Sequence, residues 1–315
     1  MRRIYDQLAQ ACAKGEPFAL GIIAGIKGSS PQKKGAKALF FADGSMQGTL
    51  GGGCLEAEIQ DRARRSLLTK EPATFELVLD HDFGWDDGLI CGGKVAGVIL
   101  PRAGEAASIW NAAAKTDQGV AWGVAKDFSI GLLESRPPND WLYQETVLPP
   151  CPLWIAGSGH VAQAIAPLAL QLDFEVSVFD DRPQFANAQH FPAGTKFHVD
   201  YWEKLLQEPH PQRGAFGLIA TRGHQHDALV LRDWVHRPFV KLGMIGSRRK
   251  ARLIFTQFKE EKIATEEELA KVDCPVGMDL LAVSVPEIAL SVMSDYVRKR
   301  AEAIYGREPR RAVAP

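Results

Sequence analysis

The chain has 315 residues, which at roughly 150 residues per domain predicts two domains, each able to bury its own core. Lysine and arginine number 37 and aspartate and glutamate 38, so the formal net charge is −1. This balance argues against a general nucleic-acid binder and against a polybasic membrane-surface protein. The longest apolar run, residues 18–26, is far shorter than the ~20 residues that span a bilayer.

The start of the sequence and its cysteines indicate the cellular compartment that we expect for the protein. No apolar run follows the two arginines near the start, so the beginning of the sequence does not read as a secretory signal. The five cysteines are widely scattered and include no CxxC pair. This spacing argues against a disulfide framework or a structural zinc site, and we expect a cytoplasmic protein.

The first half of the chain predicts a mixed α and β domain. Apolar runs of strand length occupy residues 18–27, 38–42, 75–79 and 95–100. The Asp43-Gly44 pair suits a hairpin turn. Helical spacing of apolar residues predicts helices over 54–68 and 106–115, and residues 120–133 suit a final hairpin.

A proline-rich segment predicts the boundary between the domains. Residues 136–150 contain four prolines, which resist both a helix and a central strand. We therefore assign residues 1–135 to the first domain, 136–150 to a linker and 151–315 to the second domain.

The second half alternates regularly between strands and helices. Strands are predicted at residues 153–156, 174–179, 196–199, 216–221 and 240–245, and helices at 160–172, 225–235, from 247 and at 285–304. Such alternation is typical of a doubly wound parallel sheet. The fold class is therefore α/β: a carboxy-terminal Rossmann-like doubly wound parallel sheet with a mixed α and β amino-terminal domain.

The strongest single motif, GSGHVA, matches the GxGxxA fingerprint directly after a strand and at the start of a helix. Gly157 permits the tight turn, Gly159 lets a pyrophosphate approach the backbone near His160, and Ala162 lets the helix pack closely on the sheet. Asp180 follows Gly159 by 21 positions, at the end of the next strand, where a carboxylate can accept from a ribose. The motif therefore predicts a phosphate or NAD(P) site, or else a structural turn on a Rossmann fold that binds something different.

Two later loops are predicted at the carboxyl edge of the same sheet, where such folds bind ligands. The first, TRGHQHD, contains Arg222 and His224, and the second contains Gly246, Ser247 and Arg248. His224 suits a ligand or a proton-transfer group, although loop histidines are more often structural. Arg248 at a helix start suits a phosphate clamp, although a solvated helix face explains it equally well.

The first half contains two thiols beside glycines. Gly52 and Gly53 lead into Cys54 at the start of a predicted helix, where the helix dipole stabilises a thiolate. Cys91 precedes two further glycines. We expect both thiols to be nucleophiles or soft-metal ligands, the alternative being packed core residues, and we expect the other three cysteines to be inert.

At this point the motifs become recognisable as a set. The first half resembles the amino-terminal domain of the XdhC/CoxI family in GSSPQKKGAKALFFADGSMQGTLGGGCLEAEI and GLICGG. The second half resembles the Rossmann domain of that family in WIAGSGHVAQAIAPLALQLDFEVSVFDDRPQFA, TRGHQHD, VKLGMIGSRRKARLIF and CPVGMDLLAVSVPEIALSV. One departure falls at residues 278–281, Met-Asp-Leu-Leu, where family members often have a Gly- and Ala-rich segment.

The resemblance implies an accessory protein without established catalytic turnover of its own. Such a protein holds the molybdenum cofactor, as molybdopterin or its dinucleotide form, while a cysteine desulfurase supplies sulfur, and then inserts it into a xanthine dehydrogenase-type enzyme. A homodimer is also implied. On this interpretation the Rossmann glycines receive the phosphate, and Cys54 or Cys91 faces the metal.

Two other functions remain open from the sequence. The GxGxxA motif and Asp180 also suit an NAD(P)-dependent oxidoreductase, although His224 is the one proton donor that stands out. The paired thiols also suit a nucleotide- or redox-sensing module. The GxSxG, HExxH and P-loop motifs are absent, and no Ser-His-Asp spacing is obvious.

Overall fold

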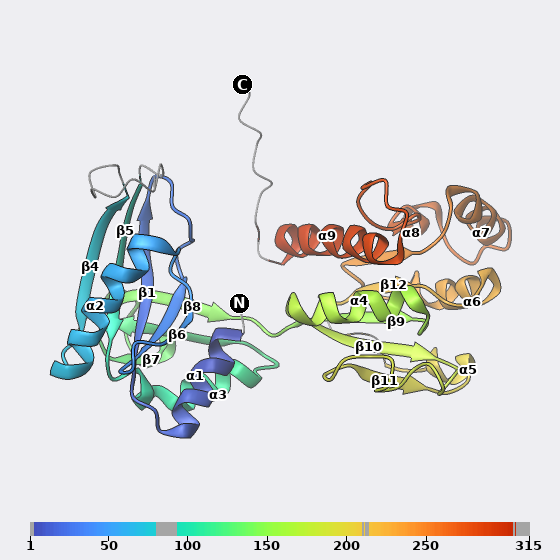
Figure 1. Cartoon of the computed structure of the whole chain (residues 1–315). Helices are drawn as coiled ribbons and strands as arrows, with labels where there is room; N and C mark the ends of the chain where they lie inside the picture. The colour runs from blue at the N-terminus through green and yellow to red at the C-terminus, as the bar shows by residue number, and fades with distance from the viewer. Residues whose placement is uncertain (1–2, 80–92, 210, 212–213, 305, 307–315) are drawn as a thin grey trace. The chain divides into compact units, whose positions relative to one another are not determined.

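The computed structural model describes residues 3–79, 93–209, 211, 214–304 and 306, apart from the Cys54 side chain. The chain divides into two compact units, residues 1–149 and 150–315. Figure 1 shows the elements of each unit. Among the described residues, no helix is long and apolar enough to cross a membrane.

The first unit is built on a five-stranded antiparallel sheet in the order β3-β2-β1-β5-β4. Its strands are β1 (Phe18–Lys27), β2 (Lys37–Phe41), β3 (Met46–Gly48), β4 (Ala73–Leu79) and β5 (Gly93–Leu100). Because side chains alternate along a strand, β1 contributes to two cores: Ala19 and Ile23 join one, and Leu20 and Ile22 join the other. Helix α2 (Gly53–Thr69) packs in the first of these cores through Ile59.

The other core of this unit lies between the large sheet, two helices and a second sheet. Helices α1 (Arg3–Lys14) and α3 (Ala107–Lys115) lie side by side (Figure 1). The second sheet has the order β7-β6-β8, from β6 (Val120–Ala125), β7 (Ile130–Leu132) and β8 (Trp141–Val147).

The structure differs from the sequence prediction at residues 136–150. Residues 141–147 of the predicted linker form β8, which pairs along β6 and buries Tyr143 and Val147. The four prolines of the segment flank this strand instead of interrupting it, so every ladder donor of β8 is kept. Helix α1, which the sequence analysis did not predict, buries Tyr5, Leu8 and Ala11 along one face.

A buried lysine ties β8 to the large sheet. The Lys37 side chain is 2% exposed, and its ammonium forms an ion pair with Glu145 on β8 and donates to the carbonyl of Gly35 at 2.8 Å. The ammonium also lies 5.4–5.5 Å from the centroids of three rings: Tyr5, Trp122 and Tyr143. Burial lowers the pKa of Lys37, and the charge of Glu145 opposes this shift.

The second unit is a six-stranded parallel sheet in the order β11-β10-β9-β12-β13-β14. Numbered within this unit, the order is 3-2-1-4-5-6, that of a doubly wound dinucleotide-binding fold. The strands are β9 (Cys151–Ala156), β10 (Phe174–Asp180), β11 (Lys196–Val199), β12 (Phe216–Ile219), β13 (Lys241–Met244) and β14 (Val272–Asp273).

Helices cover both faces of this sheet. Helices α4 (His160–Gln171) and α9 (Val285–Ala303) lie side by side in one core (Figure 1). The other core receives four helices: α5 (Trp202–Leu205), α6 (His224–Trp234), α7 (Arg248–Glu260) and α8 (Glu266–Leu269). The predicted fold class is confirmed, since a Rossmann-like parallel sheet follows a mixed α and β unit.

Residues 278–281, which depart from the family pattern, include one residue with an unusual backbone conformation. Leu281 adopts a φ of 54°, in the left-handed region that favours glycine, and its side chain points largely into solvent at 85% exposure. The following helix α9 begins with a capping box between Ser284 and Glu287.

The Lys37–Glu145 pair gives a stability prediction. Glu145→Ala leaves a buried ammonium without its counter-charge and should cost about 2–3 kcal/mol of unfolding free energy at neutral pH. Lys37→Met removes the buried charge itself, and because Glu145 is 21% exposed it can be hydrated, so the cost should be below about 1.5 kcal/mol. Urea denaturation of the full chain measures both.

The pH dependence provides a second readout for the same pair. In Glu145→Ala the unfolded state binds a proton at Lys37 more tightly than the folded state does. The loss of unfolding free energy in this variant, relative to the wild type, should therefore shrink as pH rises from neutral toward the ordinary lysine pKa of 10.5. Equal costs for the two variants at every pH would contradict this account.

Candidate functional site

The candidate site lies at the carboxyl edge of the parallel sheet, at the point where the strand order reverses. Strands β9 and β12 are neighbours there, and their helices α4 and α6 belong to cores on opposite faces of the sheet. The amide of Gly157 donates to the carbonyl of Phe179 at 2.8 Å, and that of Ala220 donates to the carbonyl of Ala156 at 2.8 Å. The turn after β9 is therefore fixed between the ends of β10 and β12.

The two glycines of this turn, Gly157 and Gly159, occupy their positions for different physical reasons. Gly157 has a φ of 113°, and a Cβ there would lie 2.1 Å from the carbonyl oxygen of Ala220, so no other residue fits. Gly159 is the N-cap of α4 with an ordinary φ of −73°, and a Cβ there would meet no atom within 4 Å. The space over the start of α4 is thus open, as a phosphate site requires.

The remaining motif residues occupy the positions that the fingerprint predicts. His160 is the first residue of α4 and is exposed at the open end of the helix. Ala162 is fully buried in the core shared by α4 and the sheet. Its small side chain permits the close packing of this helix against β9.

Asp180, at the end of β10, is engaged by the protein itself. Its side chain accepts from the amide and hydroxyl of Ser158, both at 2.7 Å, and from Arg182 through the amide at 3.0 Å, Nε at 2.8 Å and Nη2 at 2.9 Å. A carboxylate offers about four lone-pair sites, so these five donors saturate it. Burial alone would raise the pKa of Asp180, but the hydrogen bonds from Arg182 and Ser158 outweigh burial and lower it. The geometry therefore does not favour the ribose contact that the sequence predicted.

Arg222 connects the loops on either side of the glycine turn. Its Nη2 donates to the carboxylate of Asp181 at 2.9 Å and lies 3.0 Å from Nε2 of His226. Because β10 and β12 flank β9, this ion pair joins the two neighbours of the glycine strand. Arg222 thus lies at the predicted edge, as does exposed His224 at the start of α6.

A buried network of charged residues lies at this edge, and no motif in the sequence predicted it. The Asp227 carboxylate, only 2% exposed, accepts from the amide and hydroxyl of Thr221 at 3.1 and 2.8 Å and forms an ion pair with Lys250. Lys250 also donates to the carbonyl of Ile245 at 2.9 Å. Both charged residues fall within motifs quoted from the sequence, but only the fold shows that they meet.

The loop after β13 supports that lysine. A Cβ at Gly246 would lie 2.8 Å from Cδ of Lys250, so the glycine makes room for the lysine stem. Ser247 caps α7 by accepting from the Lys250 amide at 3.3 Å. Arg248 is the first residue of α7 and is exposed.

The glycine loop of the first unit already has an anionic partner. Gly52 is the N-cap of α2, with a φ of 81°, and Gly53 begins the helix. The Glu56 carboxylate turns back and accepts from the amides of Leu50 at 2.8 Å and Gly51 at 3.3 Å. Burial would raise the pKa of Glu56, but hydrogen bonds, including one from Gly52, outweigh burial and lower it. These amides are therefore not free to receive a phosphate.

The predicted thiols can be placed only in part. Cys54 lies in the first turn of α2, as expected, but its side chain lies outside the described residues, and so does all of Cys91. The three described cysteines, Cys12, Cys151 and Cys274, are free thiols. Within the described residues, no group of three or more histidine, cysteine or carboxylate side chains could hold a metal ion.

The engagement of Asp180 gives a prediction. Asp180→Asn removes a charge that holds Ser158 and Arg182, and should lower the free energy of unfolding by about 1.5–3 kcal/mol at neutral pH. A lowered folded-state pKa means that this contribution is present above the ordinary value of 3.8 and is lost as pH falls through the folded-state value. Urea denaturation of both proteins between about pH 3 and 7 checks this. A stability gap independent of pH would contradict it.

Two family models match the chain. One, described as the XdhC Rossmann domain, matches residues 153–296, and the other, described as the XdhC and CoxI family, matches residues 11–78. Together they cover about two thirds of the sequence, one in each compact unit.

Curated relatives and a solved structure resemble the chain over nearly its whole length. The uncharacterized protein YqeB of Escherichia coli K12 is 27% identical over 301 residues, 95% of this chain but 47% of that protein, so the chain spans about half the length of YqeB. A probable xanthine dehydrogenase subunit of Bacillus subtilis 168 is 22% identical over 326 residues, 90% of this chain and 94% of that one.

A solved chain from Bacillus halodurans, described as a xanthine dehydrogenase, has a TM-score of 0.82 at 21% identity. The likeness covers 97% of this chain and 98% of that chain, and it shows a common fold. With one family model matched in each unit, the chain belongs to the XdhC and CoxI family, and its second unit is an XdhC Rossmann domain.

Proposed function

We propose that the chain is an accessory protein of a xanthine dehydrogenase-type molybdoenzyme, and that the carboxyl edge of its Rossmann unit holds the phosphate end of the molybdenum cofactor. Family membership and the named relative from Bacillus subtilis support the link to xanthine dehydrogenase. The observation that favours the phosphate site most is the open space at Gly159, at the start of α4.

The residues of the edge fit a phosphate-bearing group. The first amides of α4 have no partner within the helix, and the positive end of its dipole faces the space over Gly159. Arg248 adds an exposed cation on the loop after β13, whereas the charge of Arg222, on the loop after β12, is balanced by Asp181. Asp180, a buried carboxylate beside the turn, is neutralised by Arg182 and turned toward Ser158. The helix start and Arg248 therefore favour an anion at this edge.

The two ends of the cofactor need different chemistry. The cofactor supplies a pterin with a phosphate at one end and a soft metal centre at the other. The Rossmann edge offers amides and guanidinium groups, which suit phosphate. Cys54, in the first turn of α2, and Cys91 are the soft donors that we propose for the metal, because thiolates bind soft metals.

A protein that holds the cofactor and passes it on needs partner proteins. Holding the cofactor while a cysteine desulfurase supplies its sulfur, and then passing it to an apo-enzyme, calls for contact with both proteins. We propose those two partners, together with a homodimeric state, and no turnover by the chain itself.

An NAD(P)-dependent oxidoreductase is less well supported. That function needs a free acid at the end of the second strand to accept from the ribose. Here Asp180 is saturated by Ser158 and Arg182. The glycine turn remains compatible with a dinucleotide, so NAD binding is a necessary comparison in the experiment.

The phosphate site predicts the effect of one glycine substitution. Gly159→Ala should leave the free energy of unfolding nearly unchanged, because its Cβ meets no protein atom, but should lower cofactor retention at least tenfold by filling the ligand's space. Protein purified from a molybdenum-replete host is oxidised, and pterin fluorescence and bound molybdenum are measured. Gly104→Ala, in the first unit and away from the Rossmann edge, is the matched control. Its Cβ would make only an ordinary contact at 3.8 Å with Phe18 of the same unit.

Three outcomes separate the functions. Equal retention by the wild type and both variants would contradict the phosphate site. Absence of pterin and metal from the wild type, together with saturable NAD binding, would favour the oxidoreductase instead. Pterin and metal that are lost only in Gly159→Ala would support the proposal.

The thiols make a separate prediction. If Cys54 or Cys91 faces the metal, Cys54→Ser or Cys91→Ser should reduce bound molybdenum while leaving the pterin phosphate site intact. Cys12→Ser is the control, because Cys12 is a free, half-buried thiol packed against a core of the first unit. Wild-type molybdenum content in both single variants and in the double variant would show that the thiols have no such role.

A further inference from the structure

A groove between α6 and α7 lies on the second unit; it shares His224 and Ser247 with the candidate edge, but its lining does not include the glycine turn. Its volume is about 990 Å³, within the size range of small-molecule sites. Side chains of these two helices and Ser247 line it. We call it the α6/α7 groove.

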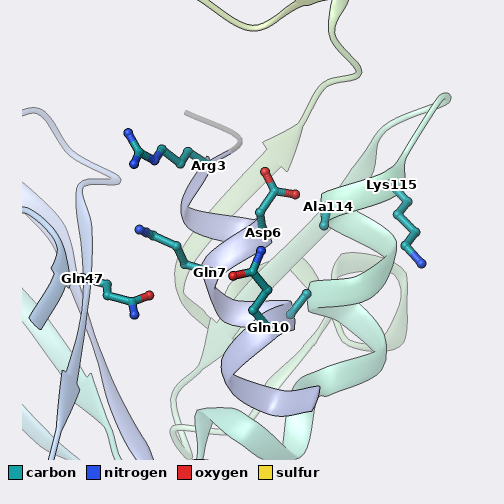
Figure 2. A pocket seen from close by; sticks show the side chains of 8 residues that line it. Arg3, Asp6, Gln7, Gln10, Gln47, Ala114 and Lys115 are labelled. Atoms are coloured by element: carbon teal, nitrogen blue, oxygen red, sulfur yellow. The ribbon is translucent and has the colours of Figure 1, made fainter. Parts of the chain in front are cut away.

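The charge of the lining has a single sign. Arg232, Arg249 and Lys250 line the groove, and no aspartate or glutamate does. Three other cavities lined by described residues mix both signs. The cavity in Figure 2, beside α1 and α3, sets Arg3 and Lys115 against Asp6. A cavity near Leu100 sets Lys70 and Arg102 against three acids: Glu71, Glu105 and Asp127.

The cations of the groove differ in how far they are already neutralised. Arg232 forms an exposed ion pair with Glu261 at 3.2 Å, so its charge is largely balanced. Lys250 is held by Asp227 and by the carbonyl of Ile245. These two acceptors account for two of its three N–H groups among the described residues, and its side chain is 23% exposed on the groove side. Arg249, on the next position of α7, is exposed and adds a full charge.

The groove also has an apolar wall. Phe258 and Ile254 are buried in the core below it, and Leu229 lines it from α6. Leu253 also lines the groove and is 65% exposed, although it is large and apolar. Contact with an apolar group would remove this surface from water, a favourable change that an inorganic anion could not provide.

We propose that the α6/α7 groove binds a small anion with a flat apolar body, such as an aryl phosphate. Arg249 and the third N–H of Lys250 would contact the anion, and Leu253 would cover the ring. The charge of the lining selects an anion over a cation, and the apolar wall selects an aromatic phosphate over phosphate itself. This site goes beyond the proposed function and does not depend on the identity of the cofactor.

The test uses the full chain and 1-naphthyl phosphate as the probe. Binding of the probe is measured by calorimetry and by the fluorescence of its naphthalene ring. Wild-type protein should bind one probe per chain. Arg249→Gln should weaken binding about tenfold or more through loss of a charge-assisted contact, and Leu253→Ser should weaken it several-fold. Inorganic phosphate and neutral 1-naphthol should each bind at least tenfold more weakly than the probe.

Matched controls separate this site from general attraction and from the glycine turn. Arg252→Gln removes an exposed charge from the same helix but not from the groove lining, so its affinity should equal that of the wild type. Gly159→Ala should also bind the probe normally, whether or not it retains the cofactor. The proposal is overturned if the probe does not bind, if Arg249→Gln and Arg252→Gln weaken it equally, or if Gly159→Ala abolishes binding while Arg249→Gln does not.

Discussion

The carboxylate of Asp180 is the interaction on which the shape of the candidate site depends. It crosses from the end of β10 to the turn after β9 and accepts both the amide and the hydroxyl of Ser158. Since Arg182 neutralises it, the charge can remain buried without the cost of an unpaired ion. The turn is thereby held in the conformation that leaves the start of α4 open. An acid that binds a ribose in related folds serves here to fix the glycine turn.

Internal carboxylates recur beside the glycine turns of this chain. Glu56 fills the amides of the loop before α2, and Asp227 fixes Thr221 and Lys250 after β12. Glu56 occupies amides that could otherwise hold an outside anion, and Asp227 fixes the position of the loop after β12 and of the Lys250 side chain. The glycine turn at Gly159 differs from the loop before α2 in its internal acid: Asp180 accepts from Ser158, whereas Glu56 accepts from the amides of Leu50 and Gly51. This contrast favours a phosphate in the Rossmann unit over one at Gly52 and Gly53.

Local signals in the sequence predicted much of the fold. The alternation of strands and helices, the glycine turn and its helix depend on short-range patterns, and all are confirmed in the second unit. The strand β8 was missed because its flanking prolines dominate the composition of the segment, whereas its buried Tyr143 depends on pairing with β6. The role of Asp180 was not predictable either, since nothing near it in sequence reveals that Ser158, 22 positions earlier, is its donor. The pairing of Asp227 with Lys250 likewise joins two successive helices and exists only in the folded chain.

The central claim is that the open start of α4 receives the phosphate of a molybdenum cofactor. A crystal structure of the full chain purified with its cofactor tests it most directly. The account predicts a phosphate within hydrogen-bonding distance of the backbone amides at Gly159 and His160, with the Asp180 carboxylate still turned toward Ser158. A phosphate bound at the Glu56 loop, or an Asp180 that has released Ser158 to accept from a ribose, would contradict it.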